Sequence, residues 1–234
     1  MRLRIFPWLG QEFVSLSWEG DGKGTVEEET RELFARFAEQ LRGCGLTLDH
    51  TVRTRMWVRD MDAWHPGVHE RVRILKGPAR SVSSSHVQPE RLGPTARISV
   101  DLLAMRQPGD EKVFKEYEPQ TIVLQWLKWG GILFLSGVTD MTHATVDEQF
   151  PVIIKRLTDS LADGGASWKD VARASFFLQR DESLDTLRAR FREAVSAKIP
   201  GLDYALVDIR QGKRLEIELT AKVAGRAAAD TRAR

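Results

Sequence analysis

The sequence predicts an α+β fold in which one domain occurs twice, each copy being a mixed β-sheet with two helices packed on one face. Two observations predict it. The segment Thr25-Val26-Glu27-Glu28 reappears as Thr145-Val146-Asp147-Glu148, a shift of 120 residues (145 − 25). Both halves also follow the same order of strand, helix, strand, helix and two closing strands. An internal repeat of this length indicates a duplicated domain, and helices covering one side of a sheet form an α+β layer.

Each half opens on an apolar strand, expected at residues 13–17 and 132–136, and a helix follows. A Thr-x-x-Glu capping box begins the helix. In the first copy its apolar residues recur on one face, as expected of a helix packed on a sheet, and glycines end it. In the second copy Pro151 lies one turn inside, which predicts that this helix starts late or bends.

The remaining elements repeat in the same way. Strands are expected at 52–58 and 171–178, second helices at 68–76 and 184–198, and closing strands at 81–87, 97–104, 204–209 and 215–221. In the last strand apolar Leu215, Ile217 and Leu219 alternate with polar residues, so one face is buried. We therefore predict domains at 1–106 and 119–223, a linker at 107–118 rich in Pro, Gly and charge, and a flexible tail at 224–234.

Composition narrows the class of protein. The 234 residues are 42% hydrophobic and 29% charged, and the net charge is +2 with both signs interspersed, so no basic face for nucleic acid is expected. The N-terminus has no apolar run of signal-peptide length, and no stretch reaches the roughly 20 apolar residues of a membrane span. A single cysteine, Cys44, fits a reducing compartment. We expect a cytoplasmic protein with no membrane partner.

Arg80 is the first candidate for binding a substrate. It follows Gly77-Pro78-Ala79 and precedes a predicted strand. Because proline restricts its own backbone and that of the preceding residue, the chain enters the strand in a defined direction. A guanidinium held in this way offers two parallel donors to a carboxylate. Arg80 is therefore either the anchor for a small anionic substrate or an exposed arginine in a turn.

In this order, several motifs resemble the RidA (YjgF-type) family of reactive-intermediate deaminases, in a tandem arrangement. They are Pro78-Ala79-Arg80-Ser81 in the first copy and, in the second, Leu135-Ser136-Gly137, the run 164–171, and Leu215-Glu216-Ile217-Glu218. The resemblance implies a chorismate-mutase-like fold that assembles as trimers, here a homo-oligomer such as a trimer or a pseudo-hexamer of domains. It also implies hydrolysis of a small enamine or imine carboxylate to a ketoacid and ammonia, with no cofactor and no metal.

The resemblance also implies roles for particular residues. Arg80 would hold the substrate carboxylate, the backbone N–H of Val82 would contact the substrate, and Glu216 would orient the attacking water. Ser136 and Gly137, or more loosely Ser17, would come from the neighbouring domain. The set is split between the copies, because Ser99 stands at the first copy's glutamate position and Leu202 near the second copy's arginine position.

That split leaves alternatives open. A composite site could combine Arg80 of one copy with Ser136 and Gly137 of the other. The chain could instead be a diverged relative that acts on, or only binds, another carboxylate-bearing intermediate, such as a biosynthetic one, without deaminase activity. A third alternative is an interaction protein whose clefts are filled by side chains such as Trp18.

Overall fold

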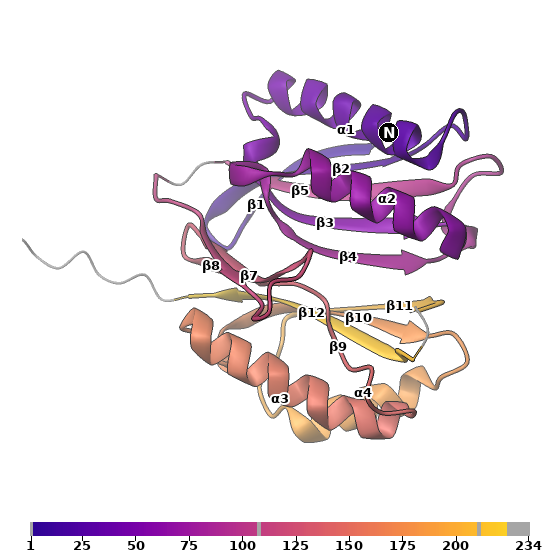
Figure 1. The fold of residues 1–234 in the computed structure, drawn as a ribbon. Coiled ribbons are helices and arrows are strands. Elements are labelled where there is room, and N and C mark those ends of the chain that lie inside the picture. The colour runs from indigo at the N-terminus through magenta and orange to yellow at the C-terminus, as the bar shows by residue number, and fades with distance from the viewer. Residues whose placement is uncertain (1, 107–108, 210–211, 224–234) are drawn as a thin grey trace, which may run out of the picture.

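The computed structural model describes residues 2–106, 109–209 and 212–223, and it shows two units stacked on each other (Figure 1). Each unit is a β-sheet with two helices on its outer face, so the layers follow the order helix, sheet, sheet, helix. Residues 107–108 of the expected linker and the expected tail at 224–234 lie outside the described residues.

The first sheet has five strands in the order β1-β2-β5-β3-β4. It is a mixed sheet, because β3 and β4 run parallel while the other neighbours are antiparallel. A parallel pair needs a crossover, and α2 supplies it. The elements are β1 (Arg2–Trp8), β2 (Gln11–Glu19), α1 (Val26–Gly43), β3 (Thr51–Val58), α2 (Met61–Ile74), β4 (Val82–Val87) and β5 (Ile98–Met105).

The second sheet follows the order β11-β10-β12-β8-β7-β6, and the short strand β9 pairs with β12. Again the strands joined by a helical crossover, β10 and β11, are parallel. The elements are β6 (Val113–Glu116), β7 (Leu124–Trp129), β8 (Ile132–Leu135), β9 (Val138–Thr139), α3 (Val146–Gly164), β10 (Val171–Gln179), α4 (Leu184–Ala194), β11 (Gly201–Val207) and β12 (Leu215–Lys222).

The first helix of each unit begins at the predicted capping box. Thr25 accepts a hydrogen bond from the backbone of Glu28, whose side chain accepts one from the backbone N–H of Thr25, and Thr145 and Glu148 do the same. Substituting such a cap by alanine costs about 1 kcal/mol. These helices are therefore fixed at their starts, over the sheets that they cover.

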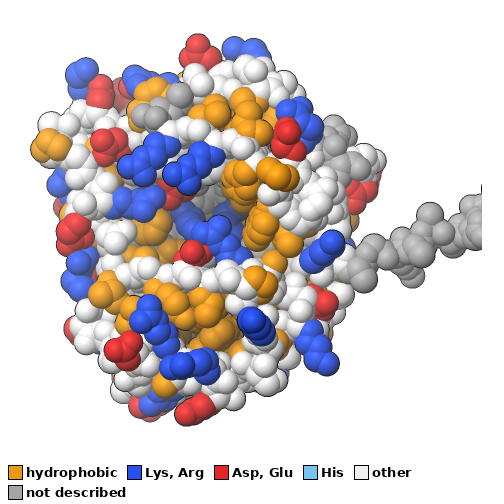
Figure 2. Space-filling model, turned by 180° about the vertical axis from the view of Figure 1, so that it is seen from behind, with side chains coloured by type: hydrophobic (Ala, Val, Ile, Leu, Met, Phe, Trp, Pro, Cys, Tyr) orange, Lys and Arg blue, Asp and Glu red, His pale blue; other side chains and the backbone are white. Residues whose placement is uncertain are grey.

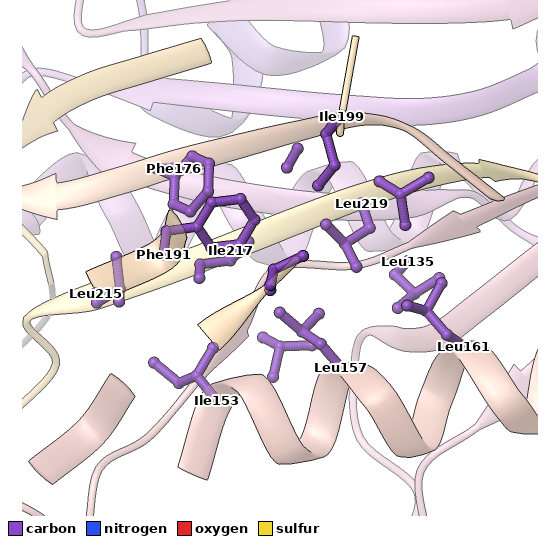
Figure 3. Close-up of a cluster of buried hydrophobic side chains, with 14 of the residues drawn as sticks. Leu135, Ile153, Leu157, Leu161, Phe176, Phe191, Ile199, Leu215, Ile217 and Leu219 are labelled. Atoms are coloured by element: carbon purple, nitrogen blue, oxygen red, sulfur yellow. The ribbon is translucent and has the colours of Figure 1, made fainter. Parts of the chain in front are cut away.

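Strand alternation separates two kinds of surface on each sheet. On β12 the apolar Leu215, Ile217 and Leu219 join the core beneath α3 and α4, where Leu157 of α3 also lies (Figure 3). The alternate residues, Glu216 and Glu218 among them, are buried and face the other sheet. The sequence alternation had predicted a buried face and a polar face, and the second unit's polar face is covered by the first unit.

The two sheets meet through their inner faces. At one end of the contact is an apolar cluster with members from both units, including Phe13, Val82, Leu127 and Phe134. Next to it Arg53 of β3 crosses to the second unit, where it donates to the carbonyls of Leu135 and Leu219 and to the hydroxyl of Thr220. The bridge between Val87 and Asp208 adds a backbone link where β4 and β11 end.

Four elements differ from the sequence expectations. β1 extends the first sheet by a strand that its two arginines and Pro7 concealed, and β6 lies within the stretch expected as a linker. The helix α3 begins at Val146 rather than late. Pro151 lies inside this helix at an exposed position. The helix α2 begins at Met61, earlier than the expected start at residue 68, because Asp60 caps it by accepting a hydrogen bond from the backbone N–H of Ala63.

Within residues 2–106, 109–209 and 212–223, none of the helices combines the length and the hydropathy that a membrane span requires.

Candidate active site

Strand β4 of the first unit lies against the second unit along one line of contact. The backbone N–H of Ser83 donates to the hydroxyl of Ser136 at 3.4 Å, and β4 also contacts β7. Ser136 and Gly137 form the turn between β8 and β9, and Glu216 follows on β12. We call this region the seam: β4 together with Ser136, Gly137 and Glu216.

Glu216 is the buried carboxylic acid of the seam. Its carboxyl is buried, and burial raises its pKa from 4.5 to about 7, against the opposing charges of Lys213 and Arg71. Gly137 lies directly on it: a Cβ at Gly137 would stand 1.8 Å from Oε1 of Glu216, so no other residue fits without displacing the carboxyl. At neutral pH this group is therefore close to half protonated and held in place, as required of a proton donor and acceptor.

Glu218, two residues along the same strand face, has the opposite character. Burial raises its pKa, but the charges of Arg55 and Arg53 and a hydrogen bond from Arg55 outweigh burial and lower it to about 2. Nε and Nη2 of Arg55 lie 2.9 and 2.7 Å from Oε2 of Glu218. Glu218 is thus a permanent anion that holds the two sheets together. Two carboxylates whose pKa values are driven apart mark an acid–base site.

The first unit contributes Arg71 and His86 to the environment of Glu216. Arg71 is buried on α2, where Nη1 donates to the carbonyl of Ser84 at 2.9 Å, and its charge acts on Glu216. Burial lowers its pKa to about 10, so it stays charged at neutral pH. His86 is also buried. Nε2 lies 3.8 Å from Oε1 of Glu216, and burial lowers the pKa of His86 to about 3, so the ring is neutral and stacks on Phe177.

Arg80 ends the tight turn that precedes β4, and Gly77 opens that turn at φ 51°, a conformation that favours glycine. The guanidinium of Arg80 donates two hydrogen bonds to the carboxylate of Glu116, one from Nη1 to Oε1 and one from Nη2 to Oε2, the latter at 3.1 Å. Arg80 and Arg71 line one cavity of about 30 Å³ between the units. A water molecule occupies about that volume in the liquid, so Glu116 must leave Arg80 before a larger carboxylate can enter.

Tyr117 follows Glu116 and extends the group toward Glu216. Burial, and then the charge of Glu216, raise the pKa of the Tyr117 hydroxyl. The group consequently contains a half-protonated carboxyl, a neutral imidazole, a phenol and two guanidiniums. Such a set can hold a carboxylate, transfer a proton and place a water. Among the described residues, no cluster of three or more His, Cys, Asp and Glu side chains is arranged to hold a metal ion.

Five of the six residues expected from the sequence lie along the first unit's contact with the second. Arg80 and Val82 are at the start of β4, and Ser136, Gly137 and Glu216 face it. The side chain of Val82 is buried in the apolar cluster between the sheets. Ser17 lies apart from these five, in β2 opposite Asp101, where it lines a separate hollow with Trp18 and Ser99.

Sequence reasoning missed Arg71, His86, Glu116 and Tyr117. Tyr117 lies just after β6 and ahead of β7. Its position before β7 was an available signal, since the chain has two tyrosines. Nothing in the sequence pairs Glu116 with Arg80, because 36 residues separate them and the contact forms only when the units dock.

Comparison with known proteins shows which solved structures have a similar fold. No protein-family model matches the sequence, and no curated protein matches it. A crystal structure of a chorismatase aligns with a TM-score of 0.66 at 18% identity, covering 90% of this chain and 74% of that one. Two single-domain structures align with about half of the chain. One is a YjgF/YER057c/UK114 family member from Mycobacterium tuberculosis (18% identity, 48% of this chain and 100% of that one, TM-score 0.42). The other is YyfA, of the Rid protein family, from Yersinia pestis (19% identity, 48% of this chain and 99% of that one, TM-score 0.44).

At these identities the likeness concerns the fold. The chorismatase match extends over both units, in agreement with the internal repeat and with the two sheets seen here. The prediction of an α+β fold with two tandem domains is confirmed: the chain consists of two α+β units in tandem, a fold that it shares with a chorismatase.

Proposed function

We propose that the chain is a cofactor-free hydrolase that protonates the carbon–carbon double bond of a small carboxylate, an enamine or an enol ether, with Glu216 as the acid. The observation that supports this proposal most directly is the burial of Glu216, which brings its pKa to about 7. A general acid works best when its pKa lies near the operating pH, and such a group contributes about 10²–10⁴-fold to the rate.

In the proposed reaction the substrate carboxylate takes the place of Glu116 on Arg80. Glu216 then gives its proton to the terminal carbon of the double bond, and the neighbouring carbon becomes an iminium or oxocarbenium centre. Water adds to that centre and returns a proton to Glu216. The adduct collapses when its hydroxyl proton moves to the leaving group, which departs as ammonia or an alcohol, and a ketoacid remains.

For an enamine such as 2-aminoacrylate, this sequence is deamination to pyruvate and ammonia. The resemblance of the Pro78-Ala79-Arg80-Ser81 and Ser136-Gly137 motifs to RidA proteins supports this substrate class. The seam supports this substrate class as well. Ser136 of the second unit lies beside β4 of the first unit, and β4 begins two residues after Arg80. The site that results is composite.

An enol ether is the second candidate, and one observation favours it. Arg71 and Arg80 line the same cavity, so two guanidiniums are available, and two guanidiniums match a dicarboxylate. Chorismate is a dicarboxylate with an enol-ether side chain, and the solved structure that aligns with both units is named a chorismatase. Hydrolysis of that side chain releases pyruvate and an alcohol, without ammonia.

One assay tests the proposal and separates the substrates. Pyruvate release is followed by coupled reduction to lactate, with freshly generated 2-aminoacrylate in one set and chorismate in the other, and ammonia is measured in parallel. We expect Glu216→Gln to remove release with the substrate that wild type accepts. If neither compound yields pyruvate faster than buffer alone, the proposal is wrong. Release that survives in Glu216→Gln would also overturn it.

The expected homo-oligomer, a trimer or pseudo-hexamer of domains, and the expected cytoplasmic location stay predictions. Sedimentation equilibrium tests the first of these.

A further inference from the structure

A second cavity lies between the inner faces of the two sheets, toward β1 and away from the seam. Its volume is about 180 Å³. In Figure 2, seen from the side opposite to Figure 1, the surface is hollowed between the units, and Lys and Arg side chains gather in and around the hollow. The residues of the lining that matter here are Phe6, Trp8, Arg53, Arg55, Asp101 and Arg173.

Three of these residues are arginines from both units, and their partners do not neutralise the set. Arg53 and Arg55 share the single carboxylate of Glu218, whose Oε2 lies 3.5 and 2.7 Å from them. Arg173 is paired with Asp203. Asp101 is paired with Arg91, which lies outside the lining. Counting Arg91 with the three arginines of the lining, four guanidiniums are paired with three carboxylates, so one positive charge is left over.

Arg53 is the member that lacks a full set of partners. Its side chain is 7% exposed, and Nε has no hydrogen-bond partner among the described residues. Although burial lowers the pKa of Arg53 to about 10, the guanidinium is still charged at neutral pH. A buried charge without full compensation is unfavourable, and an anion bound in the cavity would remove that penalty.

The wall formed by β1 is apolar and aromatic. Phe6 and Trp8 both pack on Phe13, with ring centroids 5.9 and 5.5 Å apart, so the two side chains are held rather than loose. The volume corresponds to about six water molecules, which is the size of one ring with a carboxylate. An apolar wall facing a few convergent polar groups is the usual composition of a small-molecule site.

We propose that this cavity is a second ligand site, separate from the seam, that binds a small aromatic carboxylate. The carboxylate is held among Arg53, Arg55 and Arg173, and the ring packs against Phe6 and Trp8. An inorganic anion would satisfy the arginines but would leave the aromatic wall exposed. A neutral ring would leave the excess charge in place. The aromatic carboxylate is the class that meets both requirements.

Binding of benzoate to the full chain, measured by isothermal titration calorimetry, tests this inference. We expect Arg173→Gln and Trp8→Ala each to raise the Kd for benzoate about 10-fold to 100-fold, the range for one hydrogen bond to a charged group or one buried aromatic contact. Arg188→Gln is the matched control, because Arg188 is an arginine of the same unit that lies over Tyr204 on the helix-covered face. It should bind benzoate as wild type does.

Further titrations identify the site and the ligand class. Benzyl alcohol and inorganic phosphate should bind at least 10-fold more weakly than benzoate. Glu216→Gln should retain benzoate binding even though it loses turnover, so this inference and the proposed function can fail separately. The inference is overturned if benzoate does not bind, if phosphate or benzyl alcohol binds as tightly, or if Arg80→Ala weakens binding while Arg173→Gln and Trp8→Ala do not. Thermal melts confirm that each variant is folded.

Discussion

Replacing Glu216 by glutamine should make the protein more stable at alkaline pH while removing its activity. In the folded state burial raises the pKa of Glu216 from the ordinary 4.5 to about 7. A carboxyl whose pKa is raised on folding binds its proton more tightly in the folded state. Its contribution to stability is therefore fully present below pH 4.5 and is lost as the pH rises through 7.

The size of the effect follows from those two pKa values. Each tenfold difference in proton affinity is worth about 1.4 kcal/mol, so wild type should lose about 3 kcal/mol of unfolding free energy from this one group between pH 4.5 and pH 8. Glu216→Gln has no proton to lose at that position. All other titrating groups are shared by the two proteins, so their contributions cancel in the difference.

Urea unfolding at a series of pH values measures that difference directly. We expect the free energies of unfolding of wild type and Glu216→Gln to lie closest near pH 4.5 and to diverge by about 3 kcal/mol in favour of the variant by pH 8. Curves that stay parallel over this range would refute the claim that Glu216 is a buried acid with a raised pKa. The proposed proton transfer would then lack its donor.

Four further predictions concern the seam and its supports. Arg80→Ala, and also Arg80→Lys, should abolish ketoacid release in the coupled assay, since neither offers two parallel donors to a carboxylate. Glu116→Gln should lower KM several-fold with kcat little changed, because a competing carboxylate leaves Arg80, and an unchanged KM would argue against that competition. Gly137→Ala should lower kcat with the overall melting temperature little changed, since the added Cβ would stand 1.8 Å from the Glu216 carboxyl. Glu218→Gln should cost about 3–5 kcal/mol in calorimetry at pH 7, as the buried Arg53 and the partly buried Arg55 lose their shared partner, and a loss under 1 kcal/mol would contradict that role.

Much of the fold was predictable because local rules and tertiary packing agree in this chain. The capping boxes at Thr25 and Thr145 begin helices where expected, and the alternation on β12 separates buried from polar faces. The predictions failed where local signals were weak. β1 carries exposed arginines and a proline, and it is a strand because β2 offers it an edge to pair with. The strand β6 has four residues, too few for a pattern.

By itself the sequence determined that the chain repeats one α+β unit and that Arg80, Ser136, Gly137 and Glu216 are the residues to examine. Only the tertiary structure decided which of them meet. The pairing of β9 with β12 inside the second unit places Glu216 beside Gly137. Docking of the inner sheet faces then brings His86 to Glu216, pairs Arg80 with Glu116, and gathers Arg53, Arg55 and Arg173 around a cavity. The physical reason is that desolvation and unbalanced charge belong to the interface between the units, and no single segment of the chain contains that interface.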